Sequence, residues 1–584
     1  MSPRILVLIL ALLSQPLAAT ADDADPAGDP VLTALVGELD RSMEQLSLPE
    51  APRPYWMAYT LYDSHQATAT GAFGALLHSS VGRSRPLRAE VRVGDYSSDN
   101  ANFATFGEDP SGLSGASLVI DDDPVAIARD LWIVTDAAYK SAVEGLATKE
   151  AARGPDDDET RPPDFTPAAA VVRIDSTPRP APERGTVETL VRDLSAGMAD
   201  VDGIVTSRVY ATDAAWRRYL VTSEGTRIVD VDRMTVVRAV AEVRAEDGAL
   251  VKNAASWIVK SPDHLPDPTV MEVSIRNMMS DLKAAAASQA EADYIGPVVF
   301  SGQAAAEVFR QLLVPQLMGT PAEEAGDDWS TDSRPLARLG RRVLPPGFEV
   351  NDDPAAAPEL AGSYIIDDEG IPTERVELVS EGVVQRLLMS RTPREDLAAS
   401  NGHGRGTPST RMVGMPGVLE VTADRTMSPE KLRRQAFRLA RQAGLDHVLL
   451  VRMLDDPAMR TPASVRRIRF DDDGGPALTN PLIVTRLYAD GREEPVRNAR
   501  LWSADQRALR DIVACANGTV THDYLAPPVQ HGGGGWVSGA TSGVPITLRA
   551  PSMVLVTELE MGRQPGSSGN QPLLPSPLAE APAP

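Results

Sequence analysis

The chain has 584 residues, of which 42% are hydrophobic and 24% charged, the balance of a soluble globular protein. Its formal net charge is −24. Binding to a phosphate backbone needs a basic surface, so this charge excludes nucleic acid as the expected partner, and we interpret the acidity as a contribution to solubility. A chain of this length is expected to fold into two or more domains.

The N-terminus has the layout of a secretory signal peptide. Arg4 precedes an apolar run over residues 5–13, and Ala19-Thr20-Ala21 forms a small-x-small cleavage site before Asp22. We therefore predict a signal peptide over residues 1–21 and a mature protein that is exported to the periplasm or the extracellular space. The apolar run is too short to span a bilayer. No later stretch reaches the ~18 uninterrupted apolar residues of a membrane helix, so no transmembrane segment is expected.

Cys515 is the only cysteine of the chain. An exported protein with one cysteine has no internal disulfide, so its stability must come from packing. Because Cys515 lies in an apolar run, we predict a buried, unreactive thiol.

The first half of the mature chain mixes helical and strand-like patterns. Apolar residues at three- and four-residue spacing predict helices over residues 32–46, 130–152, 188–198 and 271–290. Strands are predicted over residues 55–63, 71–79, 87–93, 205–211 and 217–222, and further strands up to residue 259, with turns at 223–225 and 246–248. The acidic, Pro-rich segment 154–167 is predicted to be a surface linker or loop. We place a domain boundary near residue 290.

The second half opens with the stretch over residues 294–319. An apolar run over 295–300 precedes a helical pattern formed by Ala306, Phe309, Leu313 and Leu317. Ser301 is the predicted N-cap of this helix, and Pro315 is expected to kink or end it. The opposite face is polar and carries Gln303, Glu307, Arg310 and Gln311.

The remainder of the second half is predicted to be rich in strands. Strand-like segments cover residues 350–354, 362–366, 375–379, 383–389, 448–453, 482–488, 494–500, 546–548 and 553–559, with a helix over 428–444. A hairpin turn is expected at 380–382. The Pro-rich residues 563–584 are predicted to be a disordered tail.

Common catalytic motifs are scarce in this sequence. The seven histidines include no two within one helical turn, which excludes a helical HExxH zinc pair. A Ser-His-Asp triad is recognised by geometry, so the sequence leaves it open, although no GxSxG elbow is present. His531 and the four glycines after it lack the Lys-Ser/Thr of a phosphate-binding loop and indicate a flexible loop instead.

Two polar segments are candidates for a site. Asp367, Asp368 and Glu369 have the chemistry of acid/base carboxylates or of a Mg²⁺ or Ca²⁺ site. We favour a turn that sets hairpin register, because Gly370 and Pro372 follow it and no second acidic cluster is tied to it by spacing. The Gly-flanked loop over 401–405, which contains His403 and Arg405, is either a functional loop or a flexible connection.

Most of the mature chain resembles the TldD/PmbA family of TldD/TldE-type metalloproteases. The stretches that carry the resemblance are residues 91–103, 131–147, 221–226, 296–317, 365–391 and 543–561, of which the DDEG segment at 367–370 is the most specific. The resemblance implies an α+β protein with two domains: an α/β N-terminal domain over residues 22–289, containing the loop near 154–167, and a β-rich C-terminal domain over 290–562. It also implies a homo- or heterodimer with a family member.

Active members of the family hold zinc with an HExxxH helix and a distant cysteine, and hydrolyse small or unfolded peptides. Matching this motif to the chain places Arg310 at the first histidine, Gln311 at the glutamate and Pro315 at the second histidine. The distant cysteine would fall near 535–538, where no thiol is present. Since arginine keeps its proton and glutamine cannot act as a general base, we expect no zinc and no other cofactor in this chain.

The first functional hypothesis is therefore an exported, metal-free family member. It would bind peptides or unfolded segments as a partner subunit, or be a degenerate peptidase. The second is an active peptidase that uses other groups, namely His403, the 367–369 carboxylates and Arg310 as an oxyanion donor. The third is a non-enzymatic envelope scaffold.

Overall fold

The protein was analysed as a computed structural model. The model describes residues 28–104, 112–153, 161–198, 204–289, 293–325, 337–408, 410–456, 477–497, 499–502, 504–527 and 543–563. The predicted signal peptide, the tail beyond residue 563, residues 154–160 and His531 with its glycines lie outside these ranges, as do residues 290–292 at the predicted domain boundary. No helix in the described ranges has the length and apolar character needed to cross a membrane.

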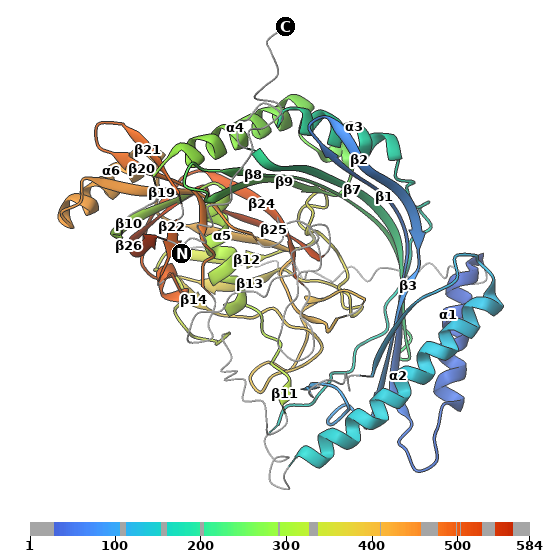
Figure 1. The fold of residues 1–584 in the computed structure, drawn as a ribbon. Coiled ribbons are helices and arrows are strands. Elements are labelled where there is room, and N and C mark those ends of the chain that lie inside the picture. Colours follow the sequence, from blue (N-terminus) through green and yellow to red (C-terminus); the bar gives the residue numbers. More distant parts are fainter. Residues whose placement is uncertain are drawn as a thin grey trace, which may run out of the picture.

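The N-terminal half forms a large curved sheet, which is almost entirely antiparallel (Figure 1). Its path is β5-β3-β1-β7-β8-β6, with β2 paired to β1 and β9 paired to β8. The strands are β1 (Pro54–Ala72), β2 (Ala75–Ser84), β3 (Pro86–Val93), β5 (Leu113–Ser117), β6 (Val172–Ile174), β7 (Ile204–Thr222), β8 (Arg227–Arg244) and β9 (Leu250–Val259). The short β4 (Phe103–Ala104) pairs in parallel with β11 (Glu324–Ala325) of the second half.

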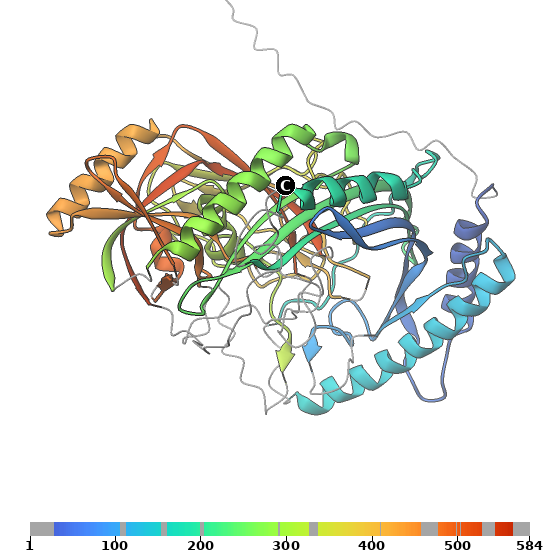
Figure 2. The same ribbon diagram turned by 45° about the horizontal axis from the view of Figure 1, so that its top comes forward.

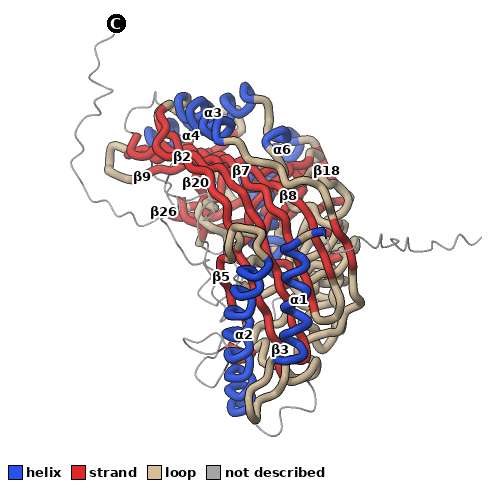
Figure 3. The backbone as a smooth tube through the Cα atoms, turned by 90° about the vertical axis from the view of Figure 1, so that its right-hand side faces the viewer, coloured by secondary structure: helices blue, strands red, loops and turns tan. Residues whose placement is uncertain are grey.

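Four helices cover the convex face of this sheet (Figures 1 and 3). They are α1 (Pro30–Gln45), α2 (Pro124–Ala152), α3 (Arg184–Ala196) and α4 (Pro268–Ala287). The first two share an apolar core with β1, β3 and β7. Helix α3 packs over β1, β2 and β7, and α4 packs over β8 and β9 (Figure 2). Three of these helices have an aspartate N-cap whose carboxylate accepts from backbone N–H groups of the first turn: Asp29 for α1, Asp123 for α2 and Asp267 for α4. A proline follows each cap, at a position where the helix needs no backbone N–H donor.

The C-terminal half lies against the concave face and contains two sheets (Figure 1). The larger has the order β18-β23-β26-β10-β19-β20-β21, with β22 on β26, and the smaller the order β14-β13-β12-β17-β25-β24. Their strands are β10 (Tyr294–Ser301), β12 (Phe348–Asp352), β13 (Val376–Ser380), β14 (Val383–Val384), β17 (Val418–Ala423), β18 (Thr426–Met427), β19 (His447–Leu454), β20 (Pro481–Tyr488), β21 (Glu493–Val496), β22 (Ala499–Leu501), β23 (Ile512–Ala516), β24 (Thr519–Ala526), β25 (Val544–Pro551) and β26 (Met553–Arg563). A separate two-stranded pair joins β15 (Gly404–Arg405) and β16 (Val413–Gly414).

Helix α5 (Gln303–Leu312) lies between these two sheets and is the centre of the C-terminal core. Its apolar side chains are fully buried with residues of both sheets, for example Leu449 of β19 and Ile546 of β25. Helix α6 (Pro429–Gln442) covers the other face of the larger sheet. The molecule thus has the two-domain α+β architecture that the sequence predicted. Within the C-terminal domain, the apolar side chains of α5 are buried between the two sheets.

Several local predictions are wrong, each for a physical reason. The strand predicted over 71–79 is split by a two-residue turn, because Phe73 and Gly74 both adopt positive φ (51° and 78°) and join β1 to β2. The break predicted at 212–216 is absent, because β7 pairs continuously with β1 and β8 through this stretch. Residues 362–366 form no strand beyond the single bridge of Ile366 with Pro372, and the strand predicted over 383–389 stops at Val384.

The loop predicted at 154–167 is coil in its described part, residues 161–167, where Asp164 and Phe165 are buried and the other residues are partly or fully exposed. Asp164 and Phe165 are 4% and 2% exposed. Lys149 donates to Asp164 at 2.7 Å, and the Phe165 ring lies between the guanidinium groups of Arg92 and Arg391, at 3.7 and 4.0 Å. Composition indicated a solvated linker here, whereas tertiary ion pairs and ring contacts bury its end.

Candidate functional site

The polar face of α5 is built around a fully buried carboxylate, Glu307. Arg310 Nε and Gln311 Nε2 both donate to Glu307 Oε2, at 2.7 and 2.5 Å. His522 Nε2 lies 2.7 Å from Oε1, and because a carboxylate only accepts, this ring nitrogen carries a proton. Burial alone would raise the pKa of Glu307, but the Arg310 charge and the bond from His522 lower it to about 2. Glu307 is therefore ionised, its two oxygens accept hydrogen bonds from three side chains, and its charge balances that of Arg310.

The same face is tied to the chain beyond β19. Arg310 Nη2 lies 3.4 Å from Asp456 Oδ1, and the guanidinium stands 5.1 Å from the centre of the Tyr524 ring. Gln311 and Thr479 exchange hydrogen bonds of 2.8 and 3.1 Å. Sequence reasoning named Arg310 and Gln311 but missed His522, Asp456, Thr479 and Tyr524, since these come from distant segments with no spacing signal.

The start and end of α5 differ in how well they were predicted. Ser301 is not the N-cap, because it still belongs to β10 and pairs with Met553. The cap is Gly302, at φ 58°, and it makes no side-chain hydrogen bond. At the other end, the helix stops at Leu312, and Pro315 lies in the 3₁₀ turn Val314–Gln316, as the missing N–H of proline requires.

The donor set on this face does not fit the zinc that the family resemblance implies. A guanidinium has no free lone pair, and the Glu307 carboxylate already accepts from three side chains. His522 is the imidazole that contacts Glu307 in the part of the chain that the structure describes, and its Nε2 proton is directed at that carboxylate. Within the described ranges no three His, Cys, Asp or Glu side chains form a group able to hold a metal. Residues 535–538, where the family's cysteine would fall, lie outside those ranges.

The second candidate segment, Asp367–Glu369, is a turn, although not one between two regular strands. Asp367 N donates to Ile371 O at 2.9 Å, and the turn closes only the isolated bridge of Ile366 with Pro372. The Asp367 carboxylate accepts from the backbone N–H groups of Glu369, Ile371 and Gly404. Burial and the adjacent Glu369 nevertheless raise the pKa of Asp367 well above its usual range.

Asp368 joins this turn to the N-terminal sheet and to the 401–405 loop. It accepts from Arg218 Nη1 of β7 at 2.9 Å and from Arg405 Nε at 3.1 Å. Gly370 packs against the same sheet, since a Cβ there would lie 3.1 Å from Thr226 Cγ2 and 3.2 Å from Leu220 Cδ2. The structure therefore brings together the two polar segments that the sequence proposed as separate candidates.

His403 is present in that loop, but it is enclosed and both its ring nitrogens are engaged. The residue is 0% exposed. Its Nε2 lies 3.0 Å from Asp352 Oδ2, and its Nδ1 lies 2.9 Å from the carbonyl oxygen of Asn401. Asp352 also accepts from Gly417 N at 3.0 Å. This arrangement is that of a structural histidine that fixes the loop.

Arg391 connects the DDEG turn to the N-terminal half. Its backbone N–H donates to Glu369 Oε2 at 2.7 Å, and its guanidinium donates to both oxygens of Glu224, at 2.8 and 2.7 Å. Its Nε also donates to Thr166 O at 3.0 Å. Two of the stretches that carry the family resemblance, 221–226 and 365–391, thus meet at one buried ion pair.

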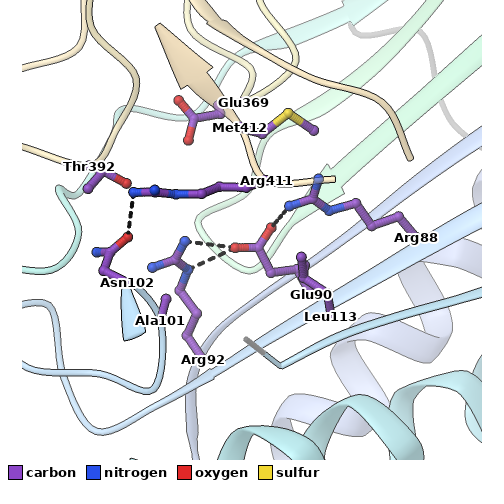
Figure 4. A pocket seen from close by; sticks show the side chains of 10 residues that line it. All are labelled: Arg88, Glu90, Arg92, Ala101, Asn102, Leu113, Glu369, Thr392, Arg411 and Met412. Carbon is purple, nitrogen blue, oxygen red and sulfur yellow. Dashed lines mark hydrogen bonds and ion pairs between the residues drawn. The ribbon is translucent and has the colours of Figure 1, made fainter. Parts of the chain in front are cut away.

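A small cavity lies between β3 and the DDEG turn (Figure 4). Its volume is about 30 Å³, and a second cavity of about 20 Å³ shares part of its wall. Burial raises the pKa of Glu369, which lines both, to about 7, with Arg391 opposing the rise. We call the first the arginine cavity, and it is lined by Arg88, Glu90, Arg92, Ala101, Asn102, Leu113, Glu369, Thr392, Arg411 and Met412.

The comparisons agree with this architecture. Residues 293–436 match the family model described as the PmbA/TldA metallopeptidase C-terminal domain. No curated protein matches the chain in sequence.

Three solved structures have a similar fold over nearly their whole length. TldE from Thermococcus kodakarensis aligns with a TM-score of 0.58 and 13% identity, covering 91% of this chain and 100% of its own. A candidate DNA-gyrase modulator from Thermotoga maritima gives 0.55 and 14%, covering 87% and 96%. A similarly described protein from Bacteroides thetaiotaomicron gives 0.54 and 11%, covering 93% and 100%. Residues 293–436 thus carry a domain similar in sequence to the PmbA/TldA metallopeptidase C-terminal domain, and the whole chain has a TldE-like fold.

Proposed function

We propose that this peptidase-related protein is a family member without a zinc centre of its own, which binds peptides or unfolded protein segments as a partner subunit or as a degenerate peptidase. It would be exported and would work as a dimer with itself or with another family member. The observation that carries the proposal is the environment of Arg310. A cation from the protein itself lies on the helix face that the family uses for zinc, and it neutralises Glu307.

The test is metal analysis and peptidase assay of the full chain purified after export. We expect far less than one zinc per chain and no cleavage of a mixed peptide library, with or without added Zn²⁺. One tightly held zinc per chain would overturn the metal-free part of the proposal. Light scattering of the protein, alone and with co-purifying family members, tests the dimer.

A peptidase that uses non-zinc groups has one observation in its favour, the pKa of about 7 at Glu369. The other residues once considered for it are engaged elsewhere, since His403 contacts Asp352 and Arg310 contacts Glu307. Zinc-independent cleavage that is lost in Glu369→Gln would establish this alternative. A scaffold role instead predicts co-purifying proteins and no binding of small peptides.

A further inference from the structure

The arginine cavity is a charged space that the proposed function leaves unexplained. Arg88 and Arg92 come from β3, Asn102 from the loop before β4, and Glu369 and Arg411 from the C-terminal half (Figure 4). Its ~30 Å³ corresponds to two or three water sites, because one water needs about 10–15 Å³ by this measure. That is the footprint of the two oxygens of a carboxylate group.

Two of the three arginines are neutralised by the protein. Arg88 and Arg92 both donate to Glu90, at 2.6 and 2.9 Å, and Arg92 also donates to Asp99 at 2.8 Å. Burial alone would raise the pKa of Glu90, but these two guanidinium groups lower it to about 2, so it is ionised. This side of the cavity has its charges paired.

Arg411 differs from the other two. Among the described residues, its guanidinium donates only to neutral oxygens, Asn102 Oδ1 at 3.2 Å and Pro321 O at 3.0 Å. Burial lowers the pKa of Arg411, and the charge of Arg92 adds to this, while the carboxylates of Glu323 and Glu369 oppose it in part. Arg411 is half-buried, and among the described residues no carboxylate accepts a hydrogen bond from it. An anion placed beside this guanidinium would be stabilised by a charge-assisted hydrogen bond.

Asn102 is held at the cavity in an uncommon conformation. Its φ is +59°, and its Nδ2 donates to Asp164 O at 2.8 Å, which directs Oδ1 at Arg411. A left-handed residue persists where its surroundings fix it, and such positions cluster at binding sites.

Glu369 supplies the opposite wall. Its Oε2 accepts from Arg391 N, and burial raises the pKa of the carboxyl to about 7, so that near neutrality the group can carry a proton and donate it. The charged groups around it are Asp367 and Asp368 on its own turn, Glu90, Arg88 and Arg92 on β3, and Arg391 and Arg411.

From this geometry we propose that the arginine cavity binds the carboxylate group of a ligand. Arg411, whose hydrogen bonds within the described residues go to neutral oxygens, provides the positive charge, and Glu369 in its protonated form donates a hydrogen bond to the second oxygen. A phosphate fits less well, because it is larger and more highly charged and would lie between Glu90 and Glu369. The carboxylate belongs either to the C-terminus of a peptide or to a free small acid. The inference rests on the cavity alone, so the metal content of the protein does not bear on it.

The experiment is calorimetric titration of the full exported chain at pH 6 and pH 8 with acetate, N-acetylalanine, N-acetylalanine amide and inorganic phosphate. We expect both carboxylates to bind and the amide to fail. Affinity should fall about tenfold from pH 6 to pH 8, since protonation of a group with pKa near 7 falls by that factor. Binding of acetate but not of N-acetylalanine would identify a free small acid, and binding of both would admit a peptide C-terminus.

Variants separate the two roles. Arg411→Met should lose at least tenfold in affinity for N-acetylalanine, and Arg411→Lys should lose less. Glu369→Gln keeps a donor at every pH, so its affinity should change less than twofold between pH 6 and pH 8. Arg425→Gln, at a side chain 93% exposed, is the matched control and should bind as the wild type does.

Three results would overturn the proposal: equal affinity for acid and amide, unchanged binding in Arg411→Met, or no saturable binding of either carboxylate in the millimolar range. Tighter binding of phosphate than of either carboxylate would also overturn it. If Arg411→Met does not fold by circular dichroism, Arg411→Lys and the pH profile of Glu369→Gln decide the matter.

Discussion

Arg391 and Glu224 form a two-pronged ion pair that holds the C-terminal half against the curved N-terminal sheet. Their side chains are 1% and 12% exposed. The backbone N–H of Arg391 also donates to Glu369. Arg391 therefore contacts both Glu224, which follows β7 of the N-terminal sheet, and the DDEG turn. The Arg391–Glu224 pair and the pair of Arg218 with Asp368 are buried polar contacts between the two domains.

Arg391→Ala should therefore lower the free energy of unfolding by ~3–5 kcal/mol, because it leaves Glu224 without its cation. Urea denaturation at pH 7 measures the loss. The control is Arg386→Ala, whose pair with Glu374 is about half exposed (46% and 50%) and should cost less than ~1 kcal/mol. Equal losses in the two variants would show that burial does not set the strength of this ion pair.

Gly370→Ala tests the packing of the turn on the sheet. The φ of +86° and the near contacts with Thr226 and Leu220 should together cost ~1–3 kcal/mol. Gly491→Ala is the matched control, because Gly491 has φ +91° and nothing within 4 Å of the added Cβ. The difference in free energy of unfolding isolates the contact between the domains. If both variants lose the same amount, that contact contributes nothing.

Arg310→Met should destabilise the protein by ~3–5 kcal/mol, since Glu307 would remain buried with only His522 and the neutral Gln311 as donors. The same substitution on an exposed helical position, Arg433→Met in α6, should cost less than ~1 kcal/mol. Chemical denaturation of both variants gives the comparison. A small loss in Arg310→Met would mean that Glu307 takes up a proton without penalty.

The depressed pKa of Glu307 predicts a pH dependence in the acid range. The folded value is about 2 and the ordinary value 4.5, so the unfolded chain binds the proton first as pH falls. The stabilisation by Glu307 is complete above pH 4.5 and is lost as pH falls towards 2. Stability measured from pH 7 to pH 3 should fall less in Glu307→Gln than in the wild type. Parallel curves would contradict the lowered pKa.

Glu369 predicts the opposite trend near neutrality. Its folded pKa of about 7 lies above the ordinary 4.5, so the folded protein keeps a proton that the unfolded chain releases. Wild-type stability should therefore fall as pH rises from 4.5 to 7, and Glu369→Gln should gain ~1–3 kcal/mol relative to the wild type over that window. Glu359→Gln, at an exposed position, should show no such gain. A pH-independent difference would place the pKa of Glu369 near its ordinary value.

Local chemistry explains what the sequence could predict. Ser428, with Pro429 at the first turn and Gly444 after the end, located α6, and the proline at 315 marked the end of α5. Cys515 is buried, and burial raises the pKa of its thiol to about 12, in agreement with an unreactive group. Each of these features depends on residues only a few positions apart.

The candidate sites depend on contacts across the whole chain. Glu307 meets His522 across 215 positions, and Arg391 meets Glu224 across 167. No spacing rule predicts such pairs, and burial at Phe165 reversed what the composition of its segment indicated. The departure from an HExxxH pattern at positions 310, 311 and 315 is visible in the sequence, whereas the hydrogen-bond network around Glu307 required the fold.

Because α5 lies in the centre of the C-terminal core, single amino-acid substitutions on its polar face are expected to destabilise the protein. Arg310 forms ion pairs with both Glu307 and Asp456. Gln311 donates hydrogen bonds to both Glu307 and Thr479. Replacing Arg310 by histidine alone would leave two buried carboxylates sharing too little positive charge before any metal could bind. A metal-binding helix could therefore be reached from this sequence only by several replacements made together, each harmful when made alone. The packing of α5 thus attaches a cost in stability to each single replacement on this face.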